Sequence, residues 1–258
     1  MAGAWLRQAE AALPLAATPL AMLGPGGRAL VLAPHPDDES LGCGGLLAAC
    51  SALGLAAQVI VVSDGSGSHP RSRSHPPPRL AALRRQEARA AVAALGLDPE
   101  GDIGFLDLPD TRLPHEGPAH QAALAALLRL VAVPPSAVFA TWRHDPHGDH
   151  AATFALARGL ARALPGPPRL YAYPVWGLAF AHPIPGFPLP AEPRPGAPAQ
   201  GWRLDITPWR AAKRAAIAAH ESQLGGVITD DATAFRLPPA ALALANRDFE
   251  LFLQETVA

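Results

Sequence analysis

The chain has 258 residues, of which 49% are hydrophobic and 17% charged, and its formal net charge is −1. This composition excludes a disordered or fibrous protein and suits one folded domain over residues 1–258. A charge so close to zero gives no reason to expect nucleic acid or an anionic membrane surface as a partner.

The N-terminal segment 1–27 contains an apolar stretch that could pass for a signal peptide. Glu10 interrupts this stretch, and Pro14 and Pro19 break it, so we expect a peripheral helix instead. No stretch reaches the roughly 20 apolar residues that span a bilayer. We therefore expect a cytoplasmic protein with no integral membrane segment, and its oligomeric state stays open.

Apolar, β-branched runs alternate with helical Ala/Leu/Arg stretches along the chain. Strands are expected at 29–33, 56–63, 102–108, 136–142 and 169–176, and helices at 40–53, 79–96, 119–132 and 151–164. A short strand, a turn and a helix follow within 202–224. Residues 182–200 carry seven prolines and are expected to form a long loop. This order predicts an α/β fold, a Rossmann-like sandwich with a mostly parallel sheet and helices on both faces.

Unusual polar clusters follow four of the predicted strands. They are "PHPDDE", "SDGSGSH", "DLPDTRL" and "RHDPHGDH", in chain order. In open α/β sheets, ligands bind beyond the carboxyl ends of the strands. We therefore expect the four clusters to meet around one site.

Two of these clusters carry metal-ligand residue types at matching spacings. His35 and Asp38 stand three apart, and His147 and His150 also stand three apart. Two histidines and one aspartate would give three protein ligands and leave one position open, which is the arrangement of a catalytic zinc site. Ferrous iron uses a similar set, so the ion could be Zn²⁺, Fe²⁺ or another divalent metal.

The residues beside these ligands suit hydrolysis of an amide or ester. A divalent metal lowers the pKa of its bound water, and Asp37 would take the proton of that water as general base. The histidine of the second pair that is not a ligand would stabilise the oxyanion or protonate the leaving amine. Asp149 lies between these histidines, where a carboxylate commonly orients an imidazole. Glu39 and Ser40 are more typical of a helix N-terminus, and Asp145 could simply stabilise its loop.

The segments "APHPDDESLGCGG" and "DPHGDHAAT" together resemble the PIG-L (LmbE-like) family of metal-dependent N-deacetylases. Smaller pieces fit in order, including "SDG", "LRRQEARAAVAALG", "FLDLPDTRL" and "KRAAIAAHESQ". The resemblance spans about residues 29–223. It implies three zinc ligands: His35, Asp38 and His150. It also implies Asp37 as general base and His147 as oxyanion-stabilising or acid histidine, with Asp149 holding His147 in place.

The resemblance also suggests substrate-side residues. Arg84 matches the family's helix arginine and Asp110 its loop aspartate, although a helix salt bridge between Arg84 and Glu87 is an alternative. An amino sugar needs several hydrogen-bond partners, and Asp64 at the second strand end could be another. The expected substrate is a small molecule or glycoconjugate that carries an N-acetylglucosamine-type amide.

Three other functions compete with this one: a family amidase for a non-sugar amide, a non-catalytic metal-binding relative, and a nucleotide-binding Rossmann protein. The last would need its glycines directly after the first strand, where "HPDDE" stands instead. Gly42, Gly44 and Gly45 come later, inside the helix, where they would permit close packing.

Overall fold

The computed structural model describes residues 1–131 and 133–257 and alternates strands with helices. The strands are β1 (Leu15–Ala16), β2 (Ala29–Ala33), β3 (Ala57–Ser63), β4 (Ile103–Leu108), β5 (Ala137–Thr141), β6 (Arg169–Tyr173), β7 (Gly201–Asp205) and β8 (Phe249–Glu255). The longer helices are α1 (Ala2–Ala12), α3 (Asp38–Ala52), α4 (Pro77–Ala94), α5 (Gly117–Leu130), α6 (Gly148–Ala163) and α8 (Arg210–Ala219). The short ones are α2 (Leu20–Leu23), α7 (Leu178–Ala181), α9 (Glu221–Leu224), α10 (Pro239–Ala245) and the 3-10 turn η1 (Thr207–Trp209).

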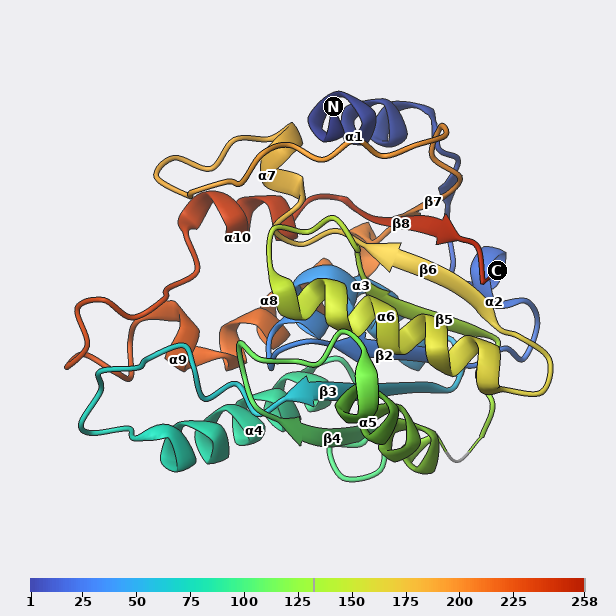
Figure 1. Ribbon diagram of the computed structural model, residues 1–258. Coiled ribbons are helices and arrows are strands. Elements are labelled where there is room, and N and C mark those ends of the chain that lie inside the picture. Colours follow the sequence, from blue (N-terminus) through green and yellow to red (C-terminus); the bar gives the residue numbers. More distant parts are fainter. Residues whose placement is uncertain (132, 258) are drawn as a thin grey trace.

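The eight strands described form one sheet in the order β1-β7-β8-β6-β5-β2-β3-β4. Most neighbours are parallel, and β8 runs antiparallel to both β6 and β7. Helices α5 and α6 cover the face toward the viewer in Figure 1, and α3 lies behind the sheet. The predicted fold class, a mostly parallel sheet with helices on both faces, is confirmed.

Strand β2 lies at the centre of this arrangement because both of its faces are buried. Val31 belongs to a core formed with α3, α4 and α8, whereas Leu30 and Leu32 belong to a second core formed with α1, α5 and α6. Successive side chains of a strand point to opposite faces, so an unbroken apolar run is what a doubly covered parallel strand requires.

The strand order reverses at β2, and this reversal positions the site. Strand β2 pairs with β3 on one side and with β5 on the other, both in parallel. A doubly wound sheet opens a crevice beyond the carboxyl ends of the strands at such a point. The segments that follow β2 and β5, which carry the two predicted ligand pairs, therefore meet there.

The ends of the chain are more closely joined to the sheet than the sequence indicated. Trp5 of the N-terminal segment stacks on Trp142, with ring centroids 5.8 Å apart, and β1 pairs with β7. Strand β8, which sequence reasoning did not anticipate, lies between β6 and β7. Residues 182–200 contain no helix or strand, as predicted. Ala132, the predicted last residue of the 119–132 helix, lies outside the described residues.

The glycines of α3 permit close packing, as expected. A Cβ atom at Gly42 would come within 2.2 Å of the Tyr173 ring, and one at Gly45 within 2.3 Å of Ile206. Lys213 and Glu250 pack against Gly44 and Gly45 of the same helix and form a buried ion pair. Lys213 Nζ lies 2.7 Å from Glu250 Oε1. Among the described residues, no helix combines the length and the apolar character that crossing a lipid bilayer requires.

Candidate active site

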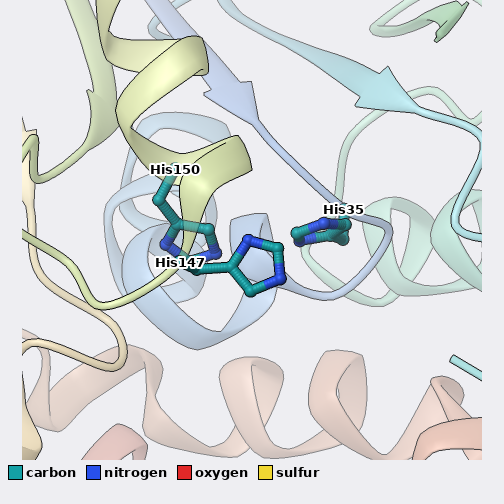
Figure 2. Close-up of side chains that lie close together, drawn as sticks. All are labelled: His35, His147 and His150. Atoms are coloured by element: carbon teal, nitrogen blue, oxygen red, sulfur yellow. The ribbon is translucent and has the colours of Figure 1, made fainter. Parts of the chain in front are cut away.

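Asp38 stands between two histidines that come from different strand ends. Its Oδ2 atom lies 3.1 Å from Nδ1 of His35, in the turn after β2, and 3.3 Å from Nε2 of His150, in the first turn of α6. Figure 2 shows His35 facing His147 and His150 across the site. The ring centroids of His35 and His147 are 4.7 Å apart, and those of His35 and His150 are 5.6 Å apart. The structure therefore brings both predicted pairs together.

His150 is buried and held in one orientation. Its Nδ1 lies 2.8 Å from Oδ2 of Asp145, a carboxylate that also accepts backbone N–H groups from residues 175–177. Its buried Nε2 faces the Asp38 carboxylate at 3.3 Å, without the geometry of a full hydrogen bond to that or any other described residue. Burial opposes charge on this ring, but the charge of Asp38 and the hydrogen bond to Asp145 raise the pKa of His150 to about 9. Asp145 therefore has two roles: it stabilises its loop, and it orients the His150 ring.

His35 is surrounded by carboxylates on both ring nitrogens. Its Nδ1 faces Asp38, and its Nε2 lies 3.2 Å from Asp110 Oδ1 and 3.2 Å from Asp149 Oδ2. Burial opposes charge on this ring, but the hydrogen bonds with Asp110, Asp149 and Asp38 raise the pKa of His35 well above its usual value. Both ligand-type histidines therefore have one nitrogen toward Asp38 and the other on a different carboxylate.

His147 is the N-cap of α6 and is a neutral imidazole. Its Nδ1 accepts a hydrogen bond from the backbone N–H of Asp149, 3.2 Å away, so Nε2 is the nitrogen that carries the proton. Burial and the neighbouring rings of His35 and His150 lower the pKa of His147 to about 4.

The Asp149 carboxylate does not lie where the sequence led us to expect it. We expected it to hold His147, but it contacts His35 and accepts the backbone N–H groups of Thr111 and Leu113, at 2.8 and 3.1 Å. The reason is the start of α6, which turns the backbone N–H of Asp149 toward His147 and its side chain toward the 111–113 loop. His147 is therefore held by the main chain of Asp149.

Asp37 lies next to this cluster in a strained backbone conformation. Its φ of 144° is in a region that favours glycine. Its N–H donates to Glu39 Oε2 at 3.0 Å, and its Oδ2 lies 3.3 Å from the Arg84 guanidinium. Burial raises the pKa of Asp37 to about 6, against the opposing charge of Arg84.

Glu39 and His220 form a buried pair that sequence reasoning missed. His220 Nε2 lies 2.9 Å from Glu39 Oε1, although the residues are 181 positions apart. Burial disfavours both charges, but each residue stabilises the charge of its partner, so the pKa of Glu39 is lowered and that of His220 is raised. Glu39 is therefore more than a helix N-terminal residue, since its second oxygen holds the N–H of Asp37.

A cavity of about 360 Å³ opens onto the cluster. The residues that line it include His35, Asp37, Asp38, Arg84, Asp110 and His147. Of the predicted substrate-side residues, Asp110 and Arg84 thus face this space. Arg84 pairs with Asp37 and donates to the carbonyls of Pro36 and Gly65, so the alternative salt bridge with Glu87 is wrong.

Asp64 is not among the described residues that line the cavity, and its predicted substrate contact stays a prediction. Its Oδ1 accepts the backbone N–H groups of Ser66 and Asp110, at 3.0 and 3.3 Å. The side chain closes the turn after β3 and supports the loop that carries Asp110.

Among the described residues, two groups of side chains have ligand atoms close enough to share a cation. One is His35, His147 and His150, and the other is His35, Asp110 and Asp149, with ligand atoms within 4.8 Å of one another in each group. Asp38 adds a carboxylate oxygen to the first group. The buried Nε2 of His150, which lacks a hydrogen bond to any described residue, fits a metal ligand, so the residues present fit a divalent ion.

Comparison with known proteins places this geometry in a family. The PIG-L family model, described as GlcNAc-PI de-N-acetylase, matches residues 30–161, just over half of the chain. A 2'-N-acetylparomamine deacetylase from Streptomyces fradiae is 35% identical over 82 residues, which cover 31% of this chain and only 29% of that relative.

Solved structures share the fold across more of the chain. The conserved protein TT1542 from Thermus thermophilus is 27% identical, with a TM-score of 0.58 over 89% of this chain and 95% of that chain. GalB, the 4-carboxy-2-hydroxymuconate hydratase from Pseudomonas putida, is 26% identical, with a TM-score of 0.55 over 75% of this chain and 78% of that chain. The family match, together with the meeting of its two motifs at one cavity, shows that the chain belongs to the PIG-L family of metal-dependent de-N-acetylases.

Proposed function

We propose that the protein is a zinc-dependent N-deacetylase that acts on an N-acetylglucosamine-type amino-sugar conjugate. In this proposal His35 Nδ1, Asp38 Oδ2 and His150 Nε2 hold the ion. The observation that carries it is that His35 Nδ1 and the buried His150 Nε2 both face one Asp38 oxygen, at 3.1 and 3.3 Å, while Asp145 fixes the other nitrogen of the His150 ring. A buried imidazole nitrogen of this kind fits a metal ligand better than a packed side chain.

The spacing of these atoms supports the ligand set. Ligands 2.0–2.1 Å from a tetrahedral zinc ion lie about 3.3 Å apart. The Asp38 oxygen lies 3.1 Å from His35 Nδ1 and 3.3 Å from His150 Nε2. Two nitrogens and one oxygen also suit Fe²⁺, so the identity of the ion is part of the proposal. A divalent ion held by these residues would lower the pKa of a water beside it.

Asp37 is proposed as the general base. It borders the cavity beside Asp38, and burial brings its pKa to about 6, close to neutrality. A base of that pKa is mostly ionised at pH 7 and can still accept a proton from a reacting water. Glu39 and Arg84 hold the main chain and side chain of Asp37, so its carboxylate is already in place before a substrate binds.

His147 is proposed to donate a hydrogen bond to the amide oxygen as negative charge develops there. Its Nδ1 is occupied by the N–H of Asp149, and its ring borders the cavity with Nε2 as the donor. A pre-positioned donor of this kind is worth about 10²–10³ in rate in other acyl-transfer sites. Asp149 serves by holding both His147, through its main chain, and His35, through its carboxylate.

On the substrate side, we propose Asp110 as a hydrogen-bond partner for a sugar hydroxyl. Arg84 donates to two backbone carbonyls, and we assign it mainly to positioning Asp37. We further propose that residues 1–258 form one domain, because β1 and β8, from the two ends of the chain, lie in the same sheet. The amino-sugar class follows the family description and the curated relative.

The test is release of acetate from N-acetylglucosamine and its glycosides by protein loaded with Zn²⁺. His150→Ala should lose both the metal and the activity, while His75→Ala, in the loop before α4, should keep both. Metal without release of acetate from any N-acetyl substrate would indicate a non-catalytic relative. Release of acetate from non-sugar amides alone would indicate the amidase.

A further inference from the structure

Three aromatic side chains from separate segments form one wall of the catalytic cavity. Trp176 follows β6, Phe187 lies in the proline-rich segment 182–200, and Phe235 lies between α9 and α10. The rings of Trp176 and Phe187 are stacked with centroids 5.0 Å apart. Phe235 meets Trp176 edge-on, with centroids 5.4 Å apart. We refer to these three residues as the aromatic wall.

The aromatic wall is fixed relative to the candidate metal cluster. The backbone N–H of Trp176 donates to Asp145, the carboxylate that orients His150. The N–H of Phe235 donates to the carbonyl of Ser68 at 3.0 Å, and the N–H of Phe187 donates to Ile184 at 3.1 Å. Backbone hydrogen bonds therefore tie the main chain at Phe235 to the segment after β3, and the bond at Phe187 closes a turn within its own segment.

The phenyl rings lie at the edge of the protein core. Trp176 is only 8% exposed, but Phe187 and Phe235 are half-buried, and both line the cavity. A half-buried aromatic ring beside a reaction site offers a large apolar contact area at little conformational cost. Phe187 and Phe235 therefore pack on the core cluster that contains Trp176 and still border the cavity.

The wall of the cavity next to Phe235 is polar. Ser68 and Gly67 follow β3, Asp110 accepts the N–H of Gly67 at 2.8 Å, and Gln223 donates to the Ser68 hydroxyl at 3.3 Å. All four residues line the same cavity. A ligand that fits has a hydrogen-bonding part next to an apolar, ring-sized part.

We propose that the aromatic wall binds an apolar, ring-sized aglycone attached to the amino sugar. The proposal rests on the deacetylase function and names its substrate class: hydrophobic glycosides of N-acetylglucosamine rather than the free sugar. A single pyranose face covers one aromatic ring, whereas Phe187 and Phe235 offer two from different segments. The polar groups at residues 67–68 adjoin Phe235, so the sugar and its aglycone share this end of the cavity.

The experiment compares N-acetylglucosamine with its phenyl β-glycoside as substrates of the Zn²⁺-loaded protein. The wild type should prefer the phenyl glycoside. Phe187→Ala and Phe235→Ala should each lower kcat/KM for the glycoside about tenfold, because removing a stacked ring costs about 1.4 kcal/mol of binding. The loss should be in KM, and kcat/KM for the free sugar should stay within about twofold.

Two further variants separate binding from folding. Leu189→Ala, in the same loop as Phe187 but outside the cavity lining, should match the wild type on both substrates. Phe235→Tyr keeps the aromatic face and should restore most of the preference. Equal losses on both substrates, or no loss on the phenyl glycoside, would overturn the proposal.

The acyl side of the substrate provides one more discriminating comparison. If the alanine variants selectively impair N-benzoylglucosamine and leave the phenyl glycoside unaffected, the aromatic wall binds the acyl group and the aglycone proposal is wrong.

Should the wild type release no acetate at all, the deacetylase function fails first. Calorimetric binding of phenyl β-D-glucosaminide to the wild type, lost in Phe187→Ala and Phe235→Ala, would still support the aromatic wall, and equal binding would refute it.

Discussion

Nδ1 of His150 lies 2.8 Å from Oδ2 of Asp145, and this contact turns the opposite ring nitrogen toward Asp38. Asp145 comes five residues earlier in the chain, in the loop between β5 and α6. The Asp145 carboxylate thus fixes the rotation of the His150 ring. It also places the proton of the neutral ring on Nδ1, the nitrogen that faces it. Carboxylates of this kind commonly raise the basicity of a metal-binding imidazole.

Asp145→Asn should therefore weaken metal binding about 10–100-fold without abolishing it. The reason is that an amide at this position supports the imidazole less strongly than a carboxylate does. Competition with a zinc chelator measures the affinity, and Asp248→Asn, at an exposed residue between α10 and β8, is the matched control. Wild-type affinity in Asp145→Asn would show that the contact serves the loop alone.

Asp37→Asn should keep its metal and lose most of its turnover. The amide cannot accept a proton, and a positioned general base contributes about 10²–10⁴-fold in rate. Metal content and acetate release are measured on the same preparation. Loss of the metal in this variant would make Asp37 a ligand, and unchanged turnover would remove it from the mechanism.

His147→Ala should also keep its metal, while kcat falls about 10²–10³-fold through loss of the donor to the amide oxygen. Addition of free imidazole should restore part of the rate, because the vacated space adjoins the cavity. His147 also belongs to a group that could bind a cation with His35 and His150. A metal-free His147→Ala protein would favour that ligand set over the one with Asp38.

Lys213→Met should destabilise the protein by about 3–5 kcal/mol, because the buried Glu250 carboxylate loses its cationic partner and keeps the backbone N–H groups of Gly45 and Leu46. Lys213 is 1% exposed, and its Nζ donates to Glu250 and to the carbonyl of Leu41 in α3. Unfolding in urea measures the change. Arg214→Met, the exposed neighbour, should change stability by less than about 0.5 kcal/mol.

A second variant of the Lys213–Glu250 ion pair tests whether charge causes this loss of stability. The double variant Lys213→Met with Glu250→Gln should recover part of the loss, since no unpaired charge remains buried. A double variant no more stable than Lys213→Met would show that the lysine acts through packing rather than through charge.

The sheet and the meeting of the two motifs could be predicted because both depend on local pattern. Buried apolar runs mark parallel strands, and parallel strands end at one edge. Once 29–33 and 136–142 were expected as strands of one sheet, His35 and His150 could be expected at the same crevice. Placing β2 beside β5 then brought these residues together.

Other parts of the site depend on contacts that spacing along the chain does not reveal. The pair of Glu39 and His220 joins residues 181 positions apart, and a glutamate at a helix start has an ordinary local explanation. The direction of the Asp149 carboxylate depends on the 111–113 loop. Phe187 and Phe235 stand in segments without helical or strand periodicity, so only the folded chain shows that they face one cavity.

Anomalous X-ray scattering at the zinc edge, from crystals grown with Zn²⁺, would locate the proposed ion and its ligands. We expect one strong peak within bonding distance of His35 Nδ1, an Asp38 carboxylate oxygen and His150 Nε2. A peak bound instead by His35, Asp110 and Asp149, or no peak at this end of the sheet, would contradict this ligand set.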